Sequence, residues 1–384
     1  MSNFKELIDK YEVNVYPKRD VVIVKGKDAK LWDENGKTYI DCAAGIGVAT
    51  IGHCNEKVAF AISEQARTLI TNPAIFYNDK RAQILEKLVS ISPKSLTKAF
   101  LTNSGTEAIE AAIKFARVST GKTDFITAMK GFHGRTLGAL SGTYKSEYRE
   151  PFEPLVPGFS FVPFNNLEKL ESAITDKTAG IILEVVQGEG GINIGSKDYF
   201  EGVRKICDEK NILMIIDEIQ TGFCRTGKMF ACEHFEIQPD IMTVAKAIAG
   251  GFPMGAALCS EKVNISVGKH GTTFGGNPLA SAASLAAIEF MLENNLPGQA
   301  NEKGNYFVSK IDLENLSKVR SVRNLGLMIG IELKEKVQPY IIDLMNKGVL
   351  AMPAGTTVLR LLPPAVISHE ELDKVAEILN EMLK

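Results

Sequence analysis

The stretch Ile212-Leu-Met-Ile-Ile-Asp217 is an apolar run that ends in an acid, and it predicts a strand buried on both faces. Two similar runs, at residues 180–186 and 241–245, also contain almost no polar side chains. Strands of this kind occur in parallel sheets, because helices cover both faces of such sheets. A helical pattern at residues 198–210 lies between two of the runs. The sequence therefore predicts βαβ units, and an α/β fold, in the central part of the chain.

The two ends of the chain follow a different pattern. Residues 21–40 alternate in strand fashion around the turn Asp33-Glu34-Asn35-Gly36, which predicts a hairpin. The last hundred residues mix predicted helices with short strands, at residues 278–292, 298–314, 326–333, 358–362 and 368–383. We therefore expect a large domain over residues 42–280, with a mostly parallel sheet between helices, and a smaller α+β domain formed by residues 1–41 and 281–384.

The bulk composition argues against several classes of protein. At 384 residues the chain exceeds the usual size of one domain, and its formal net charge of −2 gives no electrostatic reason to expect a nucleic acid or an anionic membrane as partner. The six cysteines lack any C-x-x-C pair, so zinc-ligand spacing is absent and we expect no metal site. Because the sequence contains neither a signal-peptide pattern nor an apolar run of membrane-spanning length, it predicts a cytoplasmic protein.

A possible phosphate site begins at Asn103-Ser-Gly-Thr-Glu-Ala108, directly after a strand-like segment. Ser104 and Glu107 have the spacing of a capping box, which predicts the start of a helix. Gly105 and Thr106 would then place free backbone N–H groups and a hydroxyl at a helix N-terminus, where anions bind. The alternative is a helix that is only well capped.

Two charged residues follow predicted buried strands. Asp217 stands at the end of one run, and ligands of open α/β sheets bind at the carboxyl ends of strands. Its carboxylate could hold magnesium, pair with a cationic ring nitrogen, or belong to a structural ion pair. Lys246 follows the run at 241–245, and burial of an amine is costly unless the amine is paired or used covalently. Desolvation would lower the pKa of this amine, as a Schiff-base lysine requires.

An anion site, an aspartate and a strand-end lysine, in this order, are the parts that a pyridoxal phosphate site requires. The lysine would bind the aldehyde of this cofactor. The aspartate would keep the pyridine nitrogen protonated, so that the ring draws electrons from the reacting carbon. The helix N-terminus would hold the phosphate.

Six motifs lie in order along nearly the whole chain: Asn-Ser-Gly-Thr-Glu-Ala (103–108), Gly-Phe-His-Gly-Arg-Thr (131–136), Gln-Gly-Glu-Gly-Gly (187–191), Asp-Glu-Ile-Gln-Thr-Gly (217–222), Thr-Val-Ala-Lys-Ala-Ile-Ala-Gly-Gly (243–251) and Thr-Thr-Phe-Gly-Gly-Asn-Pro (272–278). This set resembles that of the class III aminotransferases, which depend on pyridoxal phosphate. The resemblance implies the fold of the fold type I pyridoxal-phosphate transferases.

The same resemblance implies which residues hold the cofactor. Lys246 is expected to form the Schiff base and to act as acid and base in the 1,3-proton shift, and Asp217 is expected to pair with the pyridinium. Phe132 would stack on the ring, and Gln220 would hydrogen-bond its phenolic oxygen. Phosphate contacts are implied for Gly105, Thr106 and Thr273. In this family the last threonine comes from the other subunit, so a homodimer is implied.

Four residues are implied in substrate binding. Arg135 is expected to hold a substrate carboxylate, and Thr272 to contact the substrate. Arg360 stands where a second carboxylate-binding arginine is expected, and Glu189 would pair with it when an ω-amine enters and release it for glutamate or 2-oxoglutarate. The alternatives are an interface ion pair for Arg360 and a solvated Glu189. We expect His133 only to pack or to hydrogen-bond locally.

Further segments are similar to the acetylornithine aminotransferase branch, and look closest to its members that serve lysine biosynthesis through an amino-group carrier protein: residues 148–152, 228–235, 270–274, 333–336, 339–341 and 350–355. The resemblance implies transfer of the terminal amino group between a carrier-linked lysine or ornithine semialdehyde pair and glutamate/2-oxoglutarate. N-acetylornithine and free ornithine are the alternative substrates. A non-catalytic homologue is disfavoured because Lys246 and Asp217 are present, whereas an aminomutase stays a rival.

Overall fold

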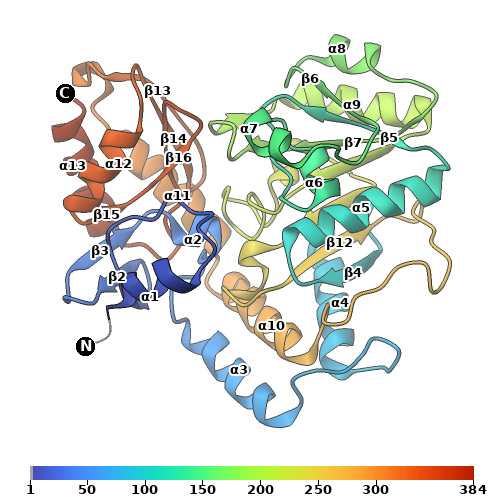
Figure 1. Ribbon diagram of the computed structural model, residues 1–384, viewed down its shortest axis with the longest axis horizontal. Coiled ribbons are helices and arrows are strands. Elements are labelled where there is room, and N and C mark those ends of the chain that lie inside the picture. The colour runs from blue at the N-terminus through green and yellow to red at the C-terminus, as the bar shows by residue number, and fades with distance from the viewer. Residues whose placement is uncertain (1–2) are drawn as a thin grey trace.

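The computed structural model describes residues 3–384 and has a seven-stranded sheet at its centre (Figure 1). In order across this sheet, the strands are β4 (Lys98–Thr102), β12 (Gly255–Cys259), β11 (Ile241–Val244), β10 (Leu213–Asp217), β7 (Thr178–Glu184), β5 (Asp124–Ala128) and β6 (Phe159–Val162). Neighbouring strands are parallel except in the two pairs made by β12. The predicted mostly parallel α/β sheet is therefore confirmed, and the three predicted apolar runs form β7, β10 and β11.

Helices cover both faces of this sheet, which is why every residue of β7, β10 and β11 is buried. Along β10, Ile215 packs in the same apolar cluster as helix α5 (Gly105–Thr120), whereas Met214 and Ile216 pack with helix α9 (Lys197–Lys210). Side chains alternate between faces in a strand, so the two helices lie on opposite faces. Full burial of one such aliphatic side chain contributes about 1.5–3 kcal/mol.

Strands from the two ends of the chain form a second sheet. β1 (Ile23–Lys27), β2 (Lys30–Asp33) and β3 (Thr38–Asp41) make an antiparallel meander, and β15 (Val349–Leu350) pairs in parallel with β3. The predicted hairpin at residues 21–40 was wrong in one respect. Its turn at residues 33–36 is present, but a second turn at Asp28, with a φ of 52°, splits the preceding segment into two strands.

A third sheet and several helices complete the C-terminal part, and Figure 1 shows them beside the N-terminal strands. The sheet has the order β13 (Val319–Leu325), β14 (Met328–Leu333), β17 (Val358–Leu361), β16 (Met352–Ala354). The helices are α10 (Pro278–Glu293), α11 (Leu296–Ser309), α12 (Gln338–Asn346) and α13 (His369–Met382). The capping box of Ser368 and Glu371 at the start of α13 is confirmed. The boundaries of the two domains stay a prediction.

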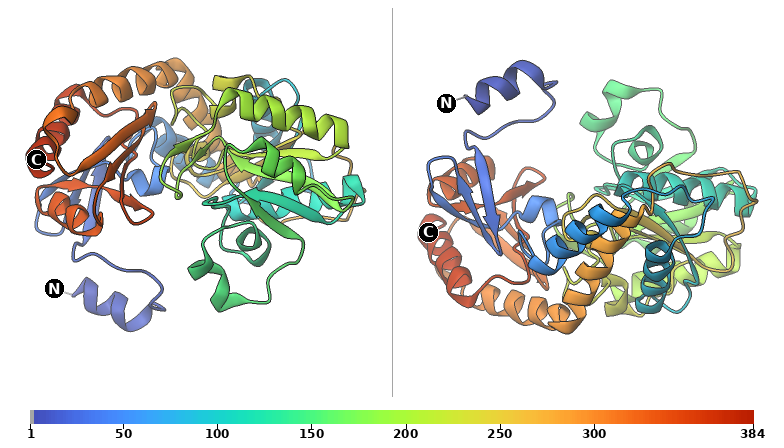
Figure 2. Two further views of the ribbon diagram at one scale, coloured as in Figure 1. Left: turned by 90° about the horizontal axis from the view of Figure 1, so that it is seen from above. Right: turned by 90° about the horizontal axis from the view of Figure 1, so that it is seen from below.

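The remaining elements are short or lie at the surface: α1 (Phe4–Tyr11), α2 (Ala44–Gly47), α3 (Glu56–Thr68), α4 (Asp79–Ile91), α6 (Leu137–Ser141), α7 (Ser146–Arg149), α8 (Leu167–Ser172), β8 (Val186–Gln187) and β9 (Asn193–Ile194). None of the residues of α1 is buried, and Figure 2 shows this helix standing away from the rest of the chain. Within residues 3–384, no helix has both the length and the apolar character that a membrane crossing needs.

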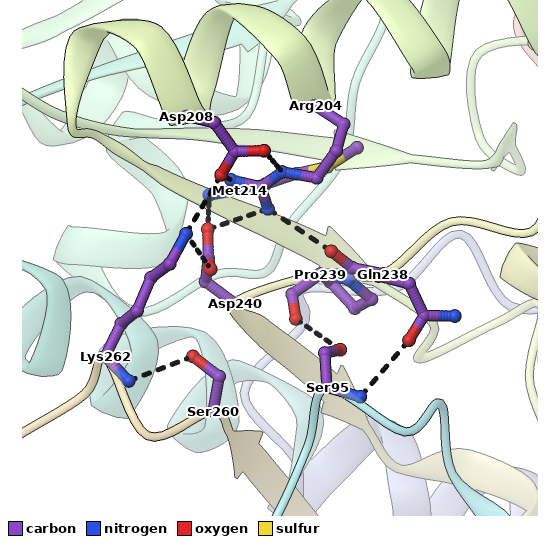
Figure 3. Close-up of polar contacts among 9 residues, drawn as sticks. All are labelled: Ser95, Arg204, Asp208, Met214, Gln238, Pro239, Asp240, Ser260 and Lys262. Carbon is purple, nitrogen blue, oxygen red and sulfur yellow. Dashed lines mark hydrogen bonds and ion pairs between the residues drawn. The ribbon is translucent and has the colours of Figure 1, made fainter.

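A buried acid ties three elements together at the edge of the sheet where β10 and β11 begin (Figure 3). Asp240 accepts hydrogen bonds from Arg204 Nη1 at 2.9 Å and from the backbone N–H of Met214 at 2.8 Å, and it pairs with Lys262 Nζ at 3.2 Å. Arg204 also pairs with Asp208, which is half exposed. Because Asp240 is buried and Asp208 is not, the two acids should differ in their contribution to stability.

Replacing Asp240 by alanine is expected to lower the free energy of unfolding by about 3 kcal/mol, since the buried N–H of Met214 loses its acceptor and the largely buried guanidinium of Arg204 loses a buried carboxylate partner. Asp208→Ala is the matched control, and should cost less than about 1 kcal/mol as an exposed pair. Urea unfolding of both variants measures the difference. Equal losses would contradict this account of the network.

Candidate active site

The carboxyl ends of the parallel strands meet at the opposite edge of the sheet, where ligands bind in open α/β folds. There, the segments that follow β4, β5, β7, β10 and β11 surround one cavity of about 440 Å³. Eight of the residues predicted from the sequence line it: Gly105, Thr106, Phe132, Arg135, Glu189, Asp217, Gln220 and Lys246. The topology thus brings together segments that are up to about 140 residues apart along the chain.

The N-terminus of helix α5 points its first turn at this cavity. Ser104 caps the helix by accepting a hydrogen bond from the N–H of Glu107, and Gly105 and Thr106 line the cavity. A Cβ at Gly105 would lie 2.8 Å from Ile219, so only glycine fits there without displacement of that side chain. The predicted capping box is only half formed, because the Glu107 carboxylate accepts from Asn103 and not from Ser104. The positive end of the helix dipole suits an anion.

The carboxylate of Asp217 is held from two sides at the end of β10. Its Oδ1 accepts a hydrogen bond from the N–H of Ile219 at 3.0 Å, and its Oδ2 lies 2.7 Å from Nδ1 of His133. Burial would lower the pKa of His133, but the hydrogen bond and the charge of Asp217, helped by Glu184, raise it overall. His133 therefore acts on the site, which the sequence analysis missed. Its position inside a motif directly after β5 was the available signal.

Glu184, at the end of β7, is the second residue that the sequence analysis missed. Its carboxylate accepts hydrogen bonds from the backbone N–H groups of Phe132 and Gly188, and it lines the cavity. Burial raises the pKa of Glu184 to about 7. The acid interrupts the apolar run at residues 180–186, where β7 ends, and this break in the pattern was visible in the sequence.

The raised pKa of Glu184 predicts how its substitution changes stability with pH. The pKa in the folded chain lies above the value of 4.5 of an unperturbed glutamate, so the contribution of this group is full below about pH 4.5 and is lost as the pH rises through about 7. The side chain in Glu184→Gln has no ionisable proton. Between pH 5 and pH 8, the free energy of unfolding of Glu184→Gln should therefore rise relative to that of the wild type by up to about 3 kcal/mol. Urea denaturation of cofactor-free protein measures this difference.

In Glu184→Gln the –NH2 group of the new amide also faces one of the two backbone N–H donors. This contact lowers the free energy of unfolding by an amount that does not vary with pH. Glu168→Gln, on the exposed surface of α8, is the control and should show no such trend. A difference between Glu184→Gln and wild type that stays constant with pH would overturn the assignment.

Lys246 follows β11, and its backbone lies in the left-handed region with a φ of 47°, which is a strained conformation for a lysine. Its side chain reaches the cavity, and within residues 3–384 it makes no hydrogen bond or ion pair. Burial lowers the pKa of Lys246, and the charges of Glu189 and Asp217 offset part of this shift. A strand end that holds a partly desolvated, unpaired amine is suited to covalent chemistry.

Arg360, in β17, is fully buried and reaches the cavity through two partners. Its Nη1 donates to Oε1 of Glu189 at 2.6 Å and to Oε1 of Gln220 at 3.1 Å. The pairing of Arg360 with Glu189 expected from the sequence is therefore formed. Within the described residues, Nε of Arg360 is buried and has no partner.

The other predicted residues lie near the mouth of the cavity or outside it. Arg135 is exposed at the mouth and Phe132 is half-buried there. Thr272 is not part of the cavity lining, but its hydroxyl accepts a hydrogen bond of 3.4 Å from Asn103, which does line the cavity. Thr273 is exposed and does not line the cavity of its own chain.

The fold and this arrangement of side chains define a pyridoxal-phosphate-dependent transferase of fold type I. The sequence model of the family "Aminotransferase class-III" matches residues 11–383. The chain therefore belongs to the class III aminotransferases and is an aminotransferase.

Two curated relatives illustrate where the chain stands in this family. A LysW-aminoadipate semialdehyde transaminase from Deinococcus radiodurans is 52% identical over 379 residues, which covers 97% of this chain and 88% of the relative. An acetylornithine aminotransferase from Methanocaldococcus jannaschii is 46% identical over 390 residues, covering 99% and 98%. Among solved structures, the ornithine aminotransferase from Toxoplasma gondii ME49 superposes with a TM-score of 0.95 at 31% identity, and covers 99% of this chain and 94% of that one.

Proposed function

We propose that the enzyme moves the terminal amino group of a lysine or ornithine that is blocked at its α-amino group, with glutamate and 2-oxoglutarate as the other substrate pair. The observation that carries this proposal is the buried Arg360, paired with Glu189 beside Lys246. An arginine left buried and unpaired would be unfavourable when an ω-amine binds, because this donor brings no carboxylate beside its amino-bearing carbon. A pair that opens can serve an ω-amine and a carboxylate in turn. Glutamate brings a carboxylate to this position and the ω-amine donor does not. In this proposal Arg135, exposed at the mouth of the cavity, binds the α-carboxylate of the blocked amino donor.

We infer that the cofactor is pyridoxal phosphate, because the donor set fits it. The N-terminus of α5, with Gly105 shaped by Ile219, offers the phosphate site, and Lys246 offers an amine for the aldehyde. Asp217, held in place by the hydrogen bond with His133, would hold the proton on the ring nitrogen. When bound, pyridoxal phosphate supplies an electron-withdrawing ring that stabilises negative charge on the carbon that bears the amino group.

In this proposal Lys246 moves the proton of the reaction. Its pKa, lowered by burial, brings the amine closer to neutral pH, where an amine can both accept and return a proton. Glu189 and Asp217 keep the pKa from falling too far. No other amine lines the cavity within the described part of the chain, so no second lysine would compete for this role.

Replacement of Glu189 by alanine is expected to shift the enzyme toward glutamate. Arg360 would lose its carboxylate partner and keep only Gln220, and it would receive the substrate carboxylate without first breaking an ion pair. We expect the ratio of kcat/KM for glutamate to kcat/KM for the ω-amine donor to rise about tenfold, which corresponds to about 1.4 kcal/mol. Single-turnover measurements of each half-reaction test this. Equal losses in both half-reactions would show that the Glu189–Arg360 pair does not select between the two substrates.

We propose a carrier-protein-linked lysine as the main donor and N-acetylornithine as the alternative. The first is supported by the higher identity to the LysW-aminoadipate semialdehyde transaminase, the second by the acetylornithine aminotransferases close behind it. The test is single turnover of the holoenzyme with carrier-linked lysine, N-acetylornithine, free ornithine and glutamate. Fastest reaction with the carrier-linked donor supports the first assignment. Preference for N-acetylornithine overturns it and supports the alternative, and absence of net amino transfer would favour an aminomutase.

We further propose a homodimer in which each chain completes the phosphate site of the other. Thr273 is exposed, and an exposed apolar segment, Ile75-Phe76-Tyr77, lies close to its loop. Arg81 links the two, since it donates to the carbonyl oxygens of Phe76 and Gly276. An apolar surface of this kind marks a contact between proteins.

Mixing inactive chains tests this arrangement. Lys246→Ala chains and Thr273→Glu chains should each be inactive as homodimers. Mixed dimers should regain activity, because one of their two sites then combines an intact Lys246 with an intact Thr273 from the other chain. If Thr273 served its own chain, mixing would restore nothing.

A further inference from the structure

Arg135, at the mouth of the cavity, lies over two aromatic rings, of which that of Tyr148 is the nearer. Its guanidinium carbon lies 3.7 Å from the centre of the ring of Tyr148, in α7, and 5.7 Å from that of Phe132. Within residues 3–384 its exposed side chain makes no hydrogen bond or ion pair. The ring of Tyr148 therefore decides where this charge stands.

The stacked geometry leaves the guanidinium free to bind an anion. Stacking uses the flat face of the group, whereas its N–H donors lie in the plane and point outward at its edge. That edge is the part that forms paired hydrogen bonds with a carboxylate. An arginine already held in place loses less conformational freedom when a substrate binds.

The same ring is connected to the cavity and to a second cation. The edge of the Phe132 ring meets Tyr148 at 6.2 Å between centroids, and Phe132 lines the cavity beside Arg135. Lys145 Nζ lies 4.8 Å from the centre of the Tyr148 ring. The hydroxyl of Tyr148 makes no hydrogen bond within the described residues, so the ring and not the oxygen carries these contacts.

We propose that Tyr148 is a positioning residue, which holds Arg135 for the α-carboxylate of the blocked amino donor and so favours donors that carry this carboxylate. This inference rests on the proposed function in one respect, that Arg135 binds a substrate carboxylate. Tyr148 itself does not touch the reacting atoms. Its effect is on substrate binding and not on the chemical step.

The experiment compares two donors that differ only in the carboxylate, N-acetylornithine and N-acetylputrescine, on holoenzyme variants. Tyr148→Leu keeps apolar bulk but removes the ring, and should raise KM for N-acetylornithine about five- to thirtyfold with kcat little changed, equivalent to about 1–2 kcal/mol. N-acetylputrescine should respond less than twofold, through its KM or, if it is not turned over, through its inhibition constant. Tyr148→Phe keeps the ring and should behave as wild type.

Three further variants separate this inference from the proposed function. Arg135→Gln should raise KM for N-acetylornithine at least as much as Tyr148→Leu, and the double variant should add nothing to Arg135→Gln. Lys145→Ala should change KM less than twofold. If Arg135→Gln leaves KM unchanged, the carboxylate role in the proposed function fails. If Arg135→Gln raises KM but Tyr148→Leu does not, or if Tyr148→Leu affects both donors equally, the positioning inference fails and the proposed function stands.

Discussion

With Lys246 replaced by alanine, the protein is expected to lose transamination almost completely, with kcat lower by at least about 10⁴-fold. The substitution removes both the amine that would hold the cofactor and the base that would move the proton. The side chain has no hydrogen bond or ion pair within residues 3–384, so the fold should tolerate its loss. Stopped-flow kinetics, with circular dichroism to check folding, measures the effect.

The absorption spectrum gives an independent readout. Wild-type holoenzyme should absorb in the visible through the lysine-bound cofactor, and this band should vanish in Lys246→Ala. Added methylamine should restore part of the activity, because a small amine can enter the space left by the side chain. Lys130→Ala, an exposed lysine outside the cavity lining, should keep both the band and the activity. Persistence of the band in Lys246→Ala would assign the covalent role to another residue.

Replacement of Asp217 by asparagine should lower kcat by about 10²–10⁴-fold, equivalent to about 3–5 kcal/mol for the loss of one partner of a buried charge pair. It should also change His133, whose raised pKa depends on the hydrogen bond and charge of Asp217. In the wild type the contribution of His133 to stability is full below about pH 6.5 and is lost as the pH rises through its higher pKa in the folded chain. In Asp217→Asn this window should disappear, because burial then lowers the pKa.

Nuclear magnetic resonance of ¹⁵N-histidine in cofactor-free protein tests the pair without any need for activity. The ring of His133 should stay an imidazolium to a higher pH in the wild type than in Asp217→Asn, because the hydrogen bond and charge of Asp217 raise its pKa. The matched control is Asp208→Asn, since this acid is exposed and belongs to the network around Asp240 on the opposite edge of the sheet. An unchanged His133 resonance in Asp217→Asn would show that another group holds its proton.

Much of the fold could be predicted because its signals are local. The runs that became β7, β10 and β11 are almost entirely apolar, a pattern typical of strands covered on both faces. The cap at Ser104 and the capping box at Ser368 depend on residues three positions apart, so they too could be recognised. The segment before Asp33 was harder, because the turn at Asp28 rests on a left-handed residue and on backbone hydrogen bonds to His53.

The sequence by itself determined the class of fold, the family and the residue types of the site, because periodicity, caps and motif order are written along the chain. Only the tertiary structure decided which of these residues act on one another. His133 and Asp217 stand 84 positions apart and meet at 2.7 Å, and Arg360 donates to Gln220 across 140 positions at 3.1 Å. Such contacts depend on which strands are neighbours in the sheet. Local patterning specifies a strand but not its neighbour, which is selected by packing of the whole core.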